Sequence, residues 1–448
     1  MSTRRGEAVV AVAVVAVFFA LRFALLVVRE PFIDEIWTVW LAKQPLANVL
    51  PALRVDSGPP LYYFLARIPD VFALRALSLL FATATLALVL LRTSLGTARW
   101  IAGALIAVYP PAALYAADAR AYALCGLFVA AGVIALHEEK PFAGAGALLL
   151  AAYSHWYGAL FLPLVLSGGQ AILPVHLGQA GLPVLHRRRL LALAVASVLF
   201  IPGLVLASKQ PAAAMAWMDA APFDAFGALS FVRPYVASLF ASPPLVLTVL
   251  AAVATLLAIA RDFRFAPAVL VPVALALAFQ AAGRQVYFPM RFEAVLAVPL
   301  ALWIATSLLR WTKQVRVALL TVLLGCGLLT TVLGIVEHQR RPPEPYAQAA
   351  YVLRTFVQPS DRVVAIGHLY LHAVHELGGG RVTAYPAEQA VHPGWRVRKL
   401  TAEKLPDGPF LLAAERIAPE LRSLRGRPVR VLYENSQAVI LRVGSYHP

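Results

Sequence analysis

Residues 30–64 read EPFIDEIWTVWLAKQPLANVLPALRVDSGPPLYYF and follow the first long apolar run of the chain. The stretch places Asp34, Glu35 and Asp56 beside that apolar run. Carboxylates next to hydrocarbon are costly, so in a strongly apolar chain they indicate a functional site by default. We therefore interpret this stretch as the working loop and the rest of the chain as its scaffold.

The composition indicates a membrane protein with many spans. Of the 448 residues, 60% are hydrophobic and only 14% are charged, whereas about 25% charged residues is usual in soluble domains. The net charge of +16 does not indicate a nucleic-acid partner, because the basic residues lie in short clusters between apolar runs, as topology signals do. Cys125 and Cys326 lie inside apolar runs, and we expect both to be small buried hydrophobic residues.

Apolar segments of near-spanning length recur along the first three quarters of the chain. We predict about eleven spans. The basic start is followed by a long apolar run without a convincing cleavage site, so we expect the first span to be retained. The segment at 142–155 is short and could be half of a broken helix. The predicted spans are 8–28, 72–91, 100–117, 121–137, 142–155, 156–175, 190–207, 243–260, 265–282, 294–309 and 317–336.

The distribution of Lys and Arg gives the orientation. If the N-terminus lies inside, the connections that face the cytoplasm are short and basic. One of them contains the Arg187–Arg189 run. The opposite connections, 29–71, 208–242 and 283–293, are longer and of mixed sign. We predict a multi-pass protein of the inner (plasma) membrane, with a cytoplasmic N-terminus and an extracytoplasmic C-terminal end.

The sequence changes character at 337–345, which reads EHQRRPPEP. Such a polar, proline-rich segment indicates a domain boundary. We predict an all-α membrane domain at 1–338, with its first outer loop at 29–71, and a small extracytoplasmic α/β domain at 346–448. Helical spacing is expected over 346–356, and an Asn435-Ser436 turn is expected to join the last two strands. The expected strands are 362–366, 410–414, 429–433 and 438–443.

Asp34 precedes a short aromatic helix that cannot cross a membrane. Trp37 and Trp40 are three residues apart and would lie on one face, where indole rings favour the membrane interface. Asp34 could be an N-cap or a reacting carboxylate, and the spacing leaves both readings open. Downstream, Asp56 precedes Pro59-Pro60, which fixes the backbone and starts a helix.

Further polar groups are predicted on the same outer side. Pro110-Pro111 is expected to break the preceding span, and the turn that follows holds Asp118 and Arg120 two residues apart. The two side chains form a local ion pair, or Arg120 is available to a phosphate. Arg284 and Arg291 oppose the topology bias and need a negative partner, which could be Glu293.

Other candidate motifs are weak. His155 lies between aromatic residues and is typical of an interfacial histidine. His368, His372 and His375 have helical spacing with Glu376, but the pattern is not HExxH, and we predict no metal ligands. The sequence holds no Walker loop, GxSxG motif or dinucleotide fingerprint.

Taken together, the motifs resemble those of the polyprenyl-phosphate-sugar-dependent membrane glycosyltransferases of the C-type fold. The likeness is to bacterial family 39 members, relatives of protein O-mannosyltransferases and lipid A aminoarabinose transferases, and it covers roughly residues 8–310. One departure is Gly58, where many members have histidine. The motifs that carry the likeness are Asp34-Glu35, Pro59–Tyr63, Asp118–Tyr122, Ser154–Tyr157 and Arg291-Phe292.

The resemblance implies an inverting hexosyl- or pentosyltransferase of the cell envelope that acts on the outer side. Asp34 would be the general base, and the leaving lipid phosphate would meet Arg291, with Arg120 or Arg284. The acceptor would be a protein, a lipid or a glycan, membrane lipids would surround the site, and the family leaves a divalent cation open without requiring a cofactor. The further residues expected to bind sugar or acceptor are Glu35, Asp56, Tyr62, Tyr63, Asp118, Tyr122 and His155.

Three alternatives remain. A transporter or flippase of lipid-linked saccharides would carry ionisable residues near the bilayer midplane and related halves. A ligase or polymerase would use a pyrophosphate-linked donor. A non-catalytic relative would keep the fold without the chemistry, although Asp34 and Arg291 are both present.

Overall fold

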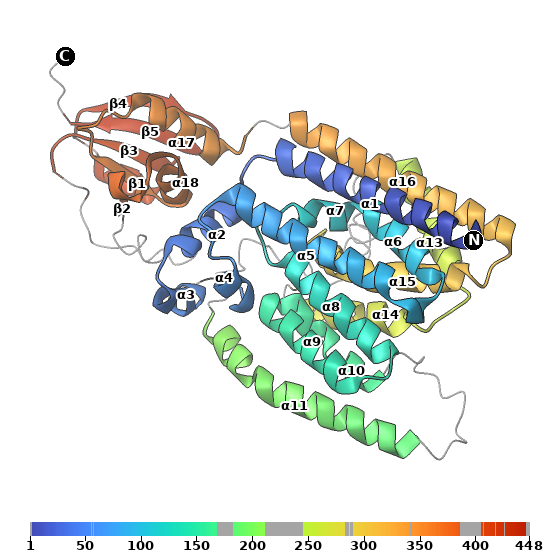
Figure 1. Ribbon diagram of the computed structural model, residues 1–448. Helices are drawn as coiled ribbons and strands as arrows, with labels where there is room; N and C mark the ends of the chain where they lie inside the picture. Colours follow the sequence, from blue (N-terminus) through green and yellow to red (C-terminus); the bar gives the residue numbers. More distant parts are fainter. Residues whose placement is uncertain are drawn as a thin grey trace.

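The computed structural model shows a long helical body with a small sheet domain at one end (Figure 1). Arg284 and residues 211–242 of the predicted outer loop 208–242 lie outside the described residues. The structure describes residues 2–54, 56, 58–167, 182–210, 245–282, 286, 290–340, 343–385, 405, 407–416, 418–424 and 426–444.

Among these residues, five helices are long and apolar enough to cross a membrane. Six shorter apolar helical segments accompany them. Both groups fall on the predicted spans. This confirms the predicted fold class, which is an all-α membrane domain followed by a small α/β domain. The five long helices are α1 (Ser2–Val28), α5 (Val71–Leu91), α11 (Leu182–Lys209), α15 (Arg291–Leu308) and α16 (Lys313–Arg340). The shorter ones are α6 (Ala98–Val108), α8 (Tyr122–His137), α9 (Pro141–Ser154), α13 (Leu245–Ile259), α14 (Ala266–Ala281) and the pair formed by a 3₁₀ turn (Trp156–Phe161) and α10 (Leu164–Ser167).

The predicted span at 100–117 is broken in two. Helix α6 ends at Val108, and α7 (Pro110–Ala116) begins at the next residue but one, with Pro110 and Pro111 in its first turn. Proline is favoured in a first helical turn because the amide hydrogen that it lacks would have no partner there. The segment at 142–155, by contrast, is one uninterrupted helix, α9.

Helix α15 forms the centre of the membrane body. Of its apolar stretch, 83% is buried inside the protein, against 28% for α1 and 22% for α11. Helices α6, α7, α8, α13 and α14 pack around α15, whereas α1 and α16 run side by side along one edge and α11 along the opposite edge (Figure 1). The outer helices therefore expose many Val, Leu and Phe side chains, as expected of helices that face lipid.

The first outer loop folds into three short helices between α1 and α5. These are α2 (Ile33–Lys43), α3 (Leu46–Leu53) and α4 (Leu61–Leu65). The prediction that Trp37 and Trp40 lie at the membrane interface is wrong, since both side chains are buried, with 3% and 6% exposure. The reason is that α2 packs against α18 (His368–Leu377) beneath the sheet domain and that Trp37 packs against Tyr63, so both tryptophans belong to one apolar cluster with residues of that domain (Figure 1).

The sheet domain begins with α17 (Pro345–Phe356) and contains a mixed five-stranded sheet. Strand order is β2-β1-β3-β5-β4, with β1 parallel to β2 and β3 and with β5 antiparallel to β3 and β4. The predicted turn joins β4 to β5, where the Asn435 side chain accepts from the Gln437 and Ala438 N–H groups. Strand β2 was missed by the sequence analysis. The strands are β1 (Val363–Ile366), β2 (Val382–Tyr385), β3 (Phe410–Glu415), β4 (Val429–Glu434) and β5 (Ala438–Val443).

The sheet is anchored through α18 (His368–Leu377), which packs on α2. Alternate residues of β1 face different cores: Val363 and Ala365 join the cluster that includes α2 and α18, and Val364 and Ile366 join a second cluster. A strand buried on both faces is typical of a parallel sheet covered by helices. One continuous apolar core thus links the sheet domain to the first outer loop.

Candidate active site

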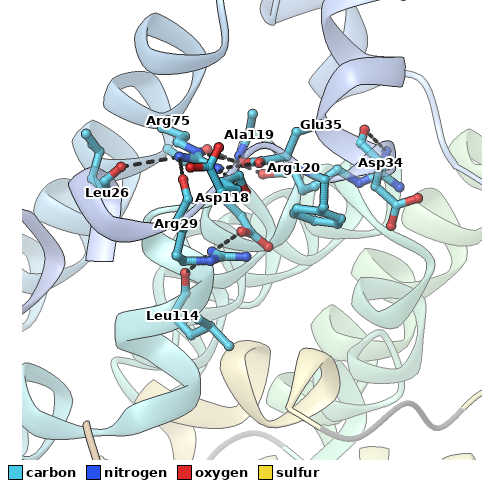
Figure 2. Close-up of polar contacts among 12 residues, drawn as sticks. Leu26, Arg29, Asp34, Glu35, Arg75, Leu114, Asp118, Ala119 and Arg120 are labelled. Carbon is cyan, nitrogen blue, oxygen red and sulfur yellow. Dashed lines mark hydrogen bonds and ion pairs between the residues drawn. The ribbon is translucent and has the colours of Figure 1, made fainter. Parts of the chain in front are cut away.

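Three segments meet where the membrane helices end, and Figure 2 shows the contacts between the first two of them. They are the first turn of α2, the turn at 117–121 between α7 and α8, and the first residue of α15, Arg291. Helix α2 starts after Phe32, whose backbone N–H donates to Glu35 Oε2 at 3.4 Å. Acidic residues in a first turn also match the positive end of the helix dipole, so the sequence favours a helix start at this point.

Asp34 is the second residue of α2, and its carboxylate does not cap the helix. The N-cap position belongs to Phe32, so the N-cap interpretation of Asp34 is wrong. Asp34 Oδ2 instead lies 3.2 Å from Nη2 of Arg291. Arg120 Nη1 donates to the backbone oxygen of Asp34 at 3.3 Å. The structure therefore brings together three residues that the sequence analysis took from three separate segments.

Glu35 is fully buried, and its two oxygens are held by protein donors. Oε1 accepts from Arg75 Nε and from the Ala119 N–H, both at 2.8 Å, and Oε2 accepts from Arg75 Nη2 at 2.5 Å. This bidentate ion pair joins α2 to α5 and to the turn at 117–121 (Figure 2). We propose a positioning role for Glu35 in place of the substrate contact that we expected.

Arg75 was missed by the sequence analysis, and it uses all five of its N–H donors. In addition to Glu35, it donates to the backbone oxygens of Leu26, Arg29 and Glu30 at 3.2, 2.7 and 3.2 Å. These carbonyls lie where α1 ends and the first outer loop begins. Arg75 therefore fixes the direction in which the chain leaves the membrane before Asp34.

Asp118 is also fully buried, and it pairs with Arg29 rather than with Arg120 (Figure 2). Arg29 Nη1 also donates to the Leu114 oxygen at 3.2 Å. Burial raises the pKa of Asp118, and the opposing effect of Arg29 does not cancel that rise. Because Asp118 is paired elsewhere, Arg120 is left to bond the α2 backbone.

Aromatic rings lie next to Arg120, Arg291 and His155. The Arg291 guanidinium lies 5.9 Å from the centre of the Tyr122 ring, and the Arg120 guanidinium lies 6.0 Å from that of Tyr63, both near the limit of a cation–π contact. The Tyr122 ring also lies 4.8 Å from the ring of His155. Burial, and then the charges of Arg120 and Arg291, lower the pKa of His155 to about 3. The imidazole is therefore neutral at physiological pH.

The second half of the outer loop is fixed by close packing around Tyr63. Its ring meets those of Tyr62 and Trp37 edge to face, with centroid distances of 5.5 and 5.2 Å. A Cβ on Gly58 would lie 2.9 Å from Cε2 of Tyr63, so a larger residue at this position would have to displace the Tyr63 ring. Asp56, between α3 and Gly58, retains only 6% exposure.

Gln210, which the sequence analysis did not single out, holds this loop from the end of α11. Its Nε2 donates to the Leu53 and Gly58 oxygens at 2.8 and 2.9 Å, and its Oε1 accepts from Trp156 Nε1 at 3.2 Å. In the described part of the chain, no three His, Cys, Asp or Glu side chains gather closely enough to hold a metal ion. Arg284 lies outside the described residues.

Comparisons with known proteins bear on the fold. No family model and no curated protein sequence matches the chain. Two solved structures of ArnT from Cupriavidus metallidurans superpose over 96% of this chain and 97% of theirs. The apo structure gives a TM-score of 0.61 at 14% identity, and the structure bound to undecaprenyl phosphate gives 0.56 at 15%. The chain therefore has the fold of ArnT, and the C-type membrane fold that its motifs predicted is confirmed.

Proposed function

We propose that the chain is a membrane glycosyltransferase that moves a sugar from a polyprenyl-phosphate donor to an acceptor hydroxyl on the outer side of the inner membrane. The observation that carries the proposal is the contact of the Asp34 carboxylate with the Arg291 guanidinium, beside Arg120, at the ends of the membrane helices. The shared fold supports it, because one ArnT structure holds undecaprenyl phosphate.

In this mechanism Asp34 removes the proton from the acceptor hydroxyl while the hydroxyl oxygen attacks the anomeric carbon. The bond from that carbon to the phosphate oxygen breaks, and the electron pair leaves with the lipid phosphate. The proton remains on Asp34 until it passes to water. The anomeric configuration is inverted because the acceptor attacks opposite to the leaving group.

Arg291 has two roles in this scheme. Without donor, its guanidinium neutralises the Asp34 carboxylate at 3.2 Å. A bound phosphate offers the guanidinium a stronger, doubly hydrogen-bonded partner, so donor binding would release Asp34 as a base. The same guanidinium then stabilises the charge that develops on the leaving phosphate.

The surroundings favour this electrostatic role. The side chains of Asp34 and Arg291 are only 11% and 18% exposed, so little water screens them. His155 stays neutral because burial and two arginines lower its pKa, so it can orient a hydroxyl without adding charge.

The test is transfer of radiolabelled sugar from a set of polyprenyl-phosphate and polyprenyl-pyrophosphate sugars, using membranes that carry each variant. Asp34→Asn should abolish transfer and leave donor binding intact. Asp70→Asn is the matched control, because Asp70 lies in the same outer loop but is exposed and caps α5 through the Ala73 N–H. This control should keep normal transfer.

Each outcome of this test has a distinct meaning. Equal transfer by wild type and Asp34→Asn would overturn the base assignment. Transfer only from pyrophosphate donors would establish the ligase or polymerase alternative. Donor binding without transfer by any form, with protein, lipid and glycan acceptors all supplied, would favour the transporter alternative.

A further inference from the structure

The proline pair that opens α7, Pro110-Pro111, removes two backbone donors. In a continuous helix the N–H groups at positions 110 and 111 would donate to the carbonyls four residues earlier, those of Ile106 and Ala107. Pro110 and Pro111 have no amide hydrogen, so these two carbonyls have no partner within the helix. A buried carbonyl without a donor is costly, and in a membrane domain water cannot replace the donor.

Arg22 of α1 supplies both missing donors. Its Nη2 donates to the Ile106 oxygen at 2.9 Å, and its Nη1 donates to the Ala107 oxygen at 2.8 Å. The residue is 1% exposed, and its guanidinium lies 3.7 Å from the centre of the Phe18 ring. A side chain some 85 positions away in the sequence therefore bonds the two carbonyls that the prolines leave open.

The environment of Arg22 suits this role. The next carbonyl, that of Val108, accepts from Thr331 Oγ1 of α16 at 2.9 Å, so three consecutive carbonyls at the end of α6 have side-chain donors. The C-terminal end of a helix carries partial negative charge, which stabilises a cation placed there. Among the described residues no carboxylate pairs with Arg22, so backbone carbonyls and the Phe18 ring are its partners.

The break determines where the candidate active-site turn lies. Helix α7 leaves α6 at the prolines and ends at the turn at 117–121. Within that turn the Ala119 N–H bonds Glu35, and Arg120 bonds the backbone of Asp34. A change in the direction of α7 would therefore move both contacts to α2.

We propose that Arg22 is a positioning residue that stabilises the α6–α7 break and so holds the turn at 117–121 against α2. The proposal rests on the proposed function only in its kinetic test. The competing role for a buried arginine in a membrane span is to bind an anion such as the donor phosphate. A small cavity beside Arg22 is also lined by Thr85, Tyr115 and Tyr122. An anion bound to Arg22 would occupy this cavity, so the alternative can be tested.

Three substitutions separate a hydrogen-bond donor from a charge. Arg22→Gln keeps two N–H donors without the charge, Arg22→Lys keeps the charge without the planar fork, and Arg22→Met keeps neither. Arg99→Met is the matched control, since Arg99 lies in α6 near its start and pairs with the half-exposed Glu7. Thr331→Val removes only the donor to the Val108 oxygen, so it should weaken the α6–α7 break less than Arg22→Met does.

The first readout is hydrogen exchange of the backbone amides at 112–119 in the purified full-length protein. Arg22→Met should raise exchange by about tenfold or more, since two buried carbonyls lose their donors. Arg22→Gln should stay within about threefold of wild type, Thr331→Val should show a smaller rise, and Arg99→Met should show no change. Unchanged exchange in Arg22→Met would overturn the proposal, whether or not the protein transfers sugar.

The second readout is the kinetics of transfer. Loss of positioning should lower kcat in Arg22→Met with little change in the donor KM, and Arg22→Gln should restore kcat. If Arg22 bound the phosphate, the donor KM would rise in Arg22→Gln and Arg22→Lys would restore it, which would contradict the proposal. Should Arg22→Met fail to fold, Arg22→Gln and Thr331→Val decide between the two roles. A rise in exchange without any transfer by wild type would uphold the role of Arg22 and reject the proposed function.

Discussion

The charged side chains of the candidate site differ in what they contact, and this separates their roles. Glu35 and Asp118 are fully buried against Arg75 and Arg29. Asp34 alone of these acids both meets an arginine and keeps some exposure, 8% of the residue. A general base must reach its substrate, so we propose Asp34 for that role and a positioning role for Glu35 and Asp118.

The ionisation of His155 gives a prediction at this scale. Burial, Arg120 and Arg291 lower its pKa in the folded protein to about 3, while an unfolded chain has a value of about 6.5. Between these values only the unfolded state takes up the proton, so the stability that the neutral imidazole contributes is complete above pH 6.5 and falls as the pH drops towards 3. His155→Gln should therefore flatten the loss of thermal stability between pH 6.5 and 4.

The measurement is the thermal unfolding midpoint of the detergent-solubilised protein at a series of pH values. The prediction fails if the unfolding midpoint of the wild type does not fall between pH 6.5 and 4. It also fails if His155→Gln shows the same fall, because the imidazole is then not held neutral in the folded protein. The same reasoning predicts that the acidic limb of a pH–rate profile does not belong to His155.

Sequence reasoning identified the residues that we propose to react more readily than the residues that position them. Asp34, Arg120 and Arg291 were predicted because a polar residue in an outer loop of an apolar chain needs an explanation. Arg22 and Arg75 lie inside apolar runs, where no motif or spacing shows which carbonyl or carboxylate they will meet. The available signal was the cost of an arginine in a membrane segment, which says that a partner exists without naming it.

At the scale of elements, α2 shows how one sequence pattern can serve two environments. An aromatic face on a short helix is covered equally well by lipid or by protein, so the tryptophans alone could not show that α2 would pack into one cluster with α18. The break after α6 was visible in the proline pair, but the donor that satisfies it comes from a distant helix. Local pattern predicts where elements begin and end, whereas pairing depends on tertiary packing.

The packing of α2 gives a prediction at this scale. Trp37 is 3% exposed, lies against Tyr63 and belongs to the apolar cluster that joins α2 to α18. Trp37→Ala should destabilise the protein by about 3–5 kcal/mol, because truncating a buried indole leaves a large cavity. Transfer should fall as well, because the same helix carries Asp34 in its first turn.

The measurement combines thermal unfolding with limited proteolysis between the membrane body and the sheet domain. Phe72→Ala is the control, since Phe72 on α5 is 55% exposed and faces outward. This control should change neither the midpoint nor the cleavage. Normal cleavage and stability in Trp37→Ala would mean that the cluster does not hold the two parts together.

At the scale of the whole molecule, the sheet domain and the first outer loop must lie on the same side of the membrane. The sequence supported this only through the odd number of predicted spans and the distribution of Lys and Arg among the loops. The structure supports it by contact, since α18 packs on α2 in one apolar cluster. The sidedness of the two regions is thus linked, although which side faces the cytoplasm follows from the charge bias alone.

Labelling of single cysteines tests that orientation. The native Cys125 and Cys326 are buried, so background reaction should be low. Glu434→Cys on β4 and Lys140→Cys in the turn before α9 provide two exposed positions, with side-chain exposures of 45% and 60% in the wild type. With the sheet domain outside, a membrane-impermeant maleimide should label Glu434→Cys in intact cells and Lys140→Cys only after permeabilisation.

The reverse pattern would place the candidate active site in the cytoplasm, where nucleotide sugars are available and a lipid-linked donor is no longer required. Labelling of both positions in intact cells would place them on the same side of the membrane. That result would require one of the predicted spans between them not to cross the membrane. The expected pattern would leave Asp34 and Arg291 facing a compartment without nucleotides, and a sugar donor there must arrive attached to a lipid.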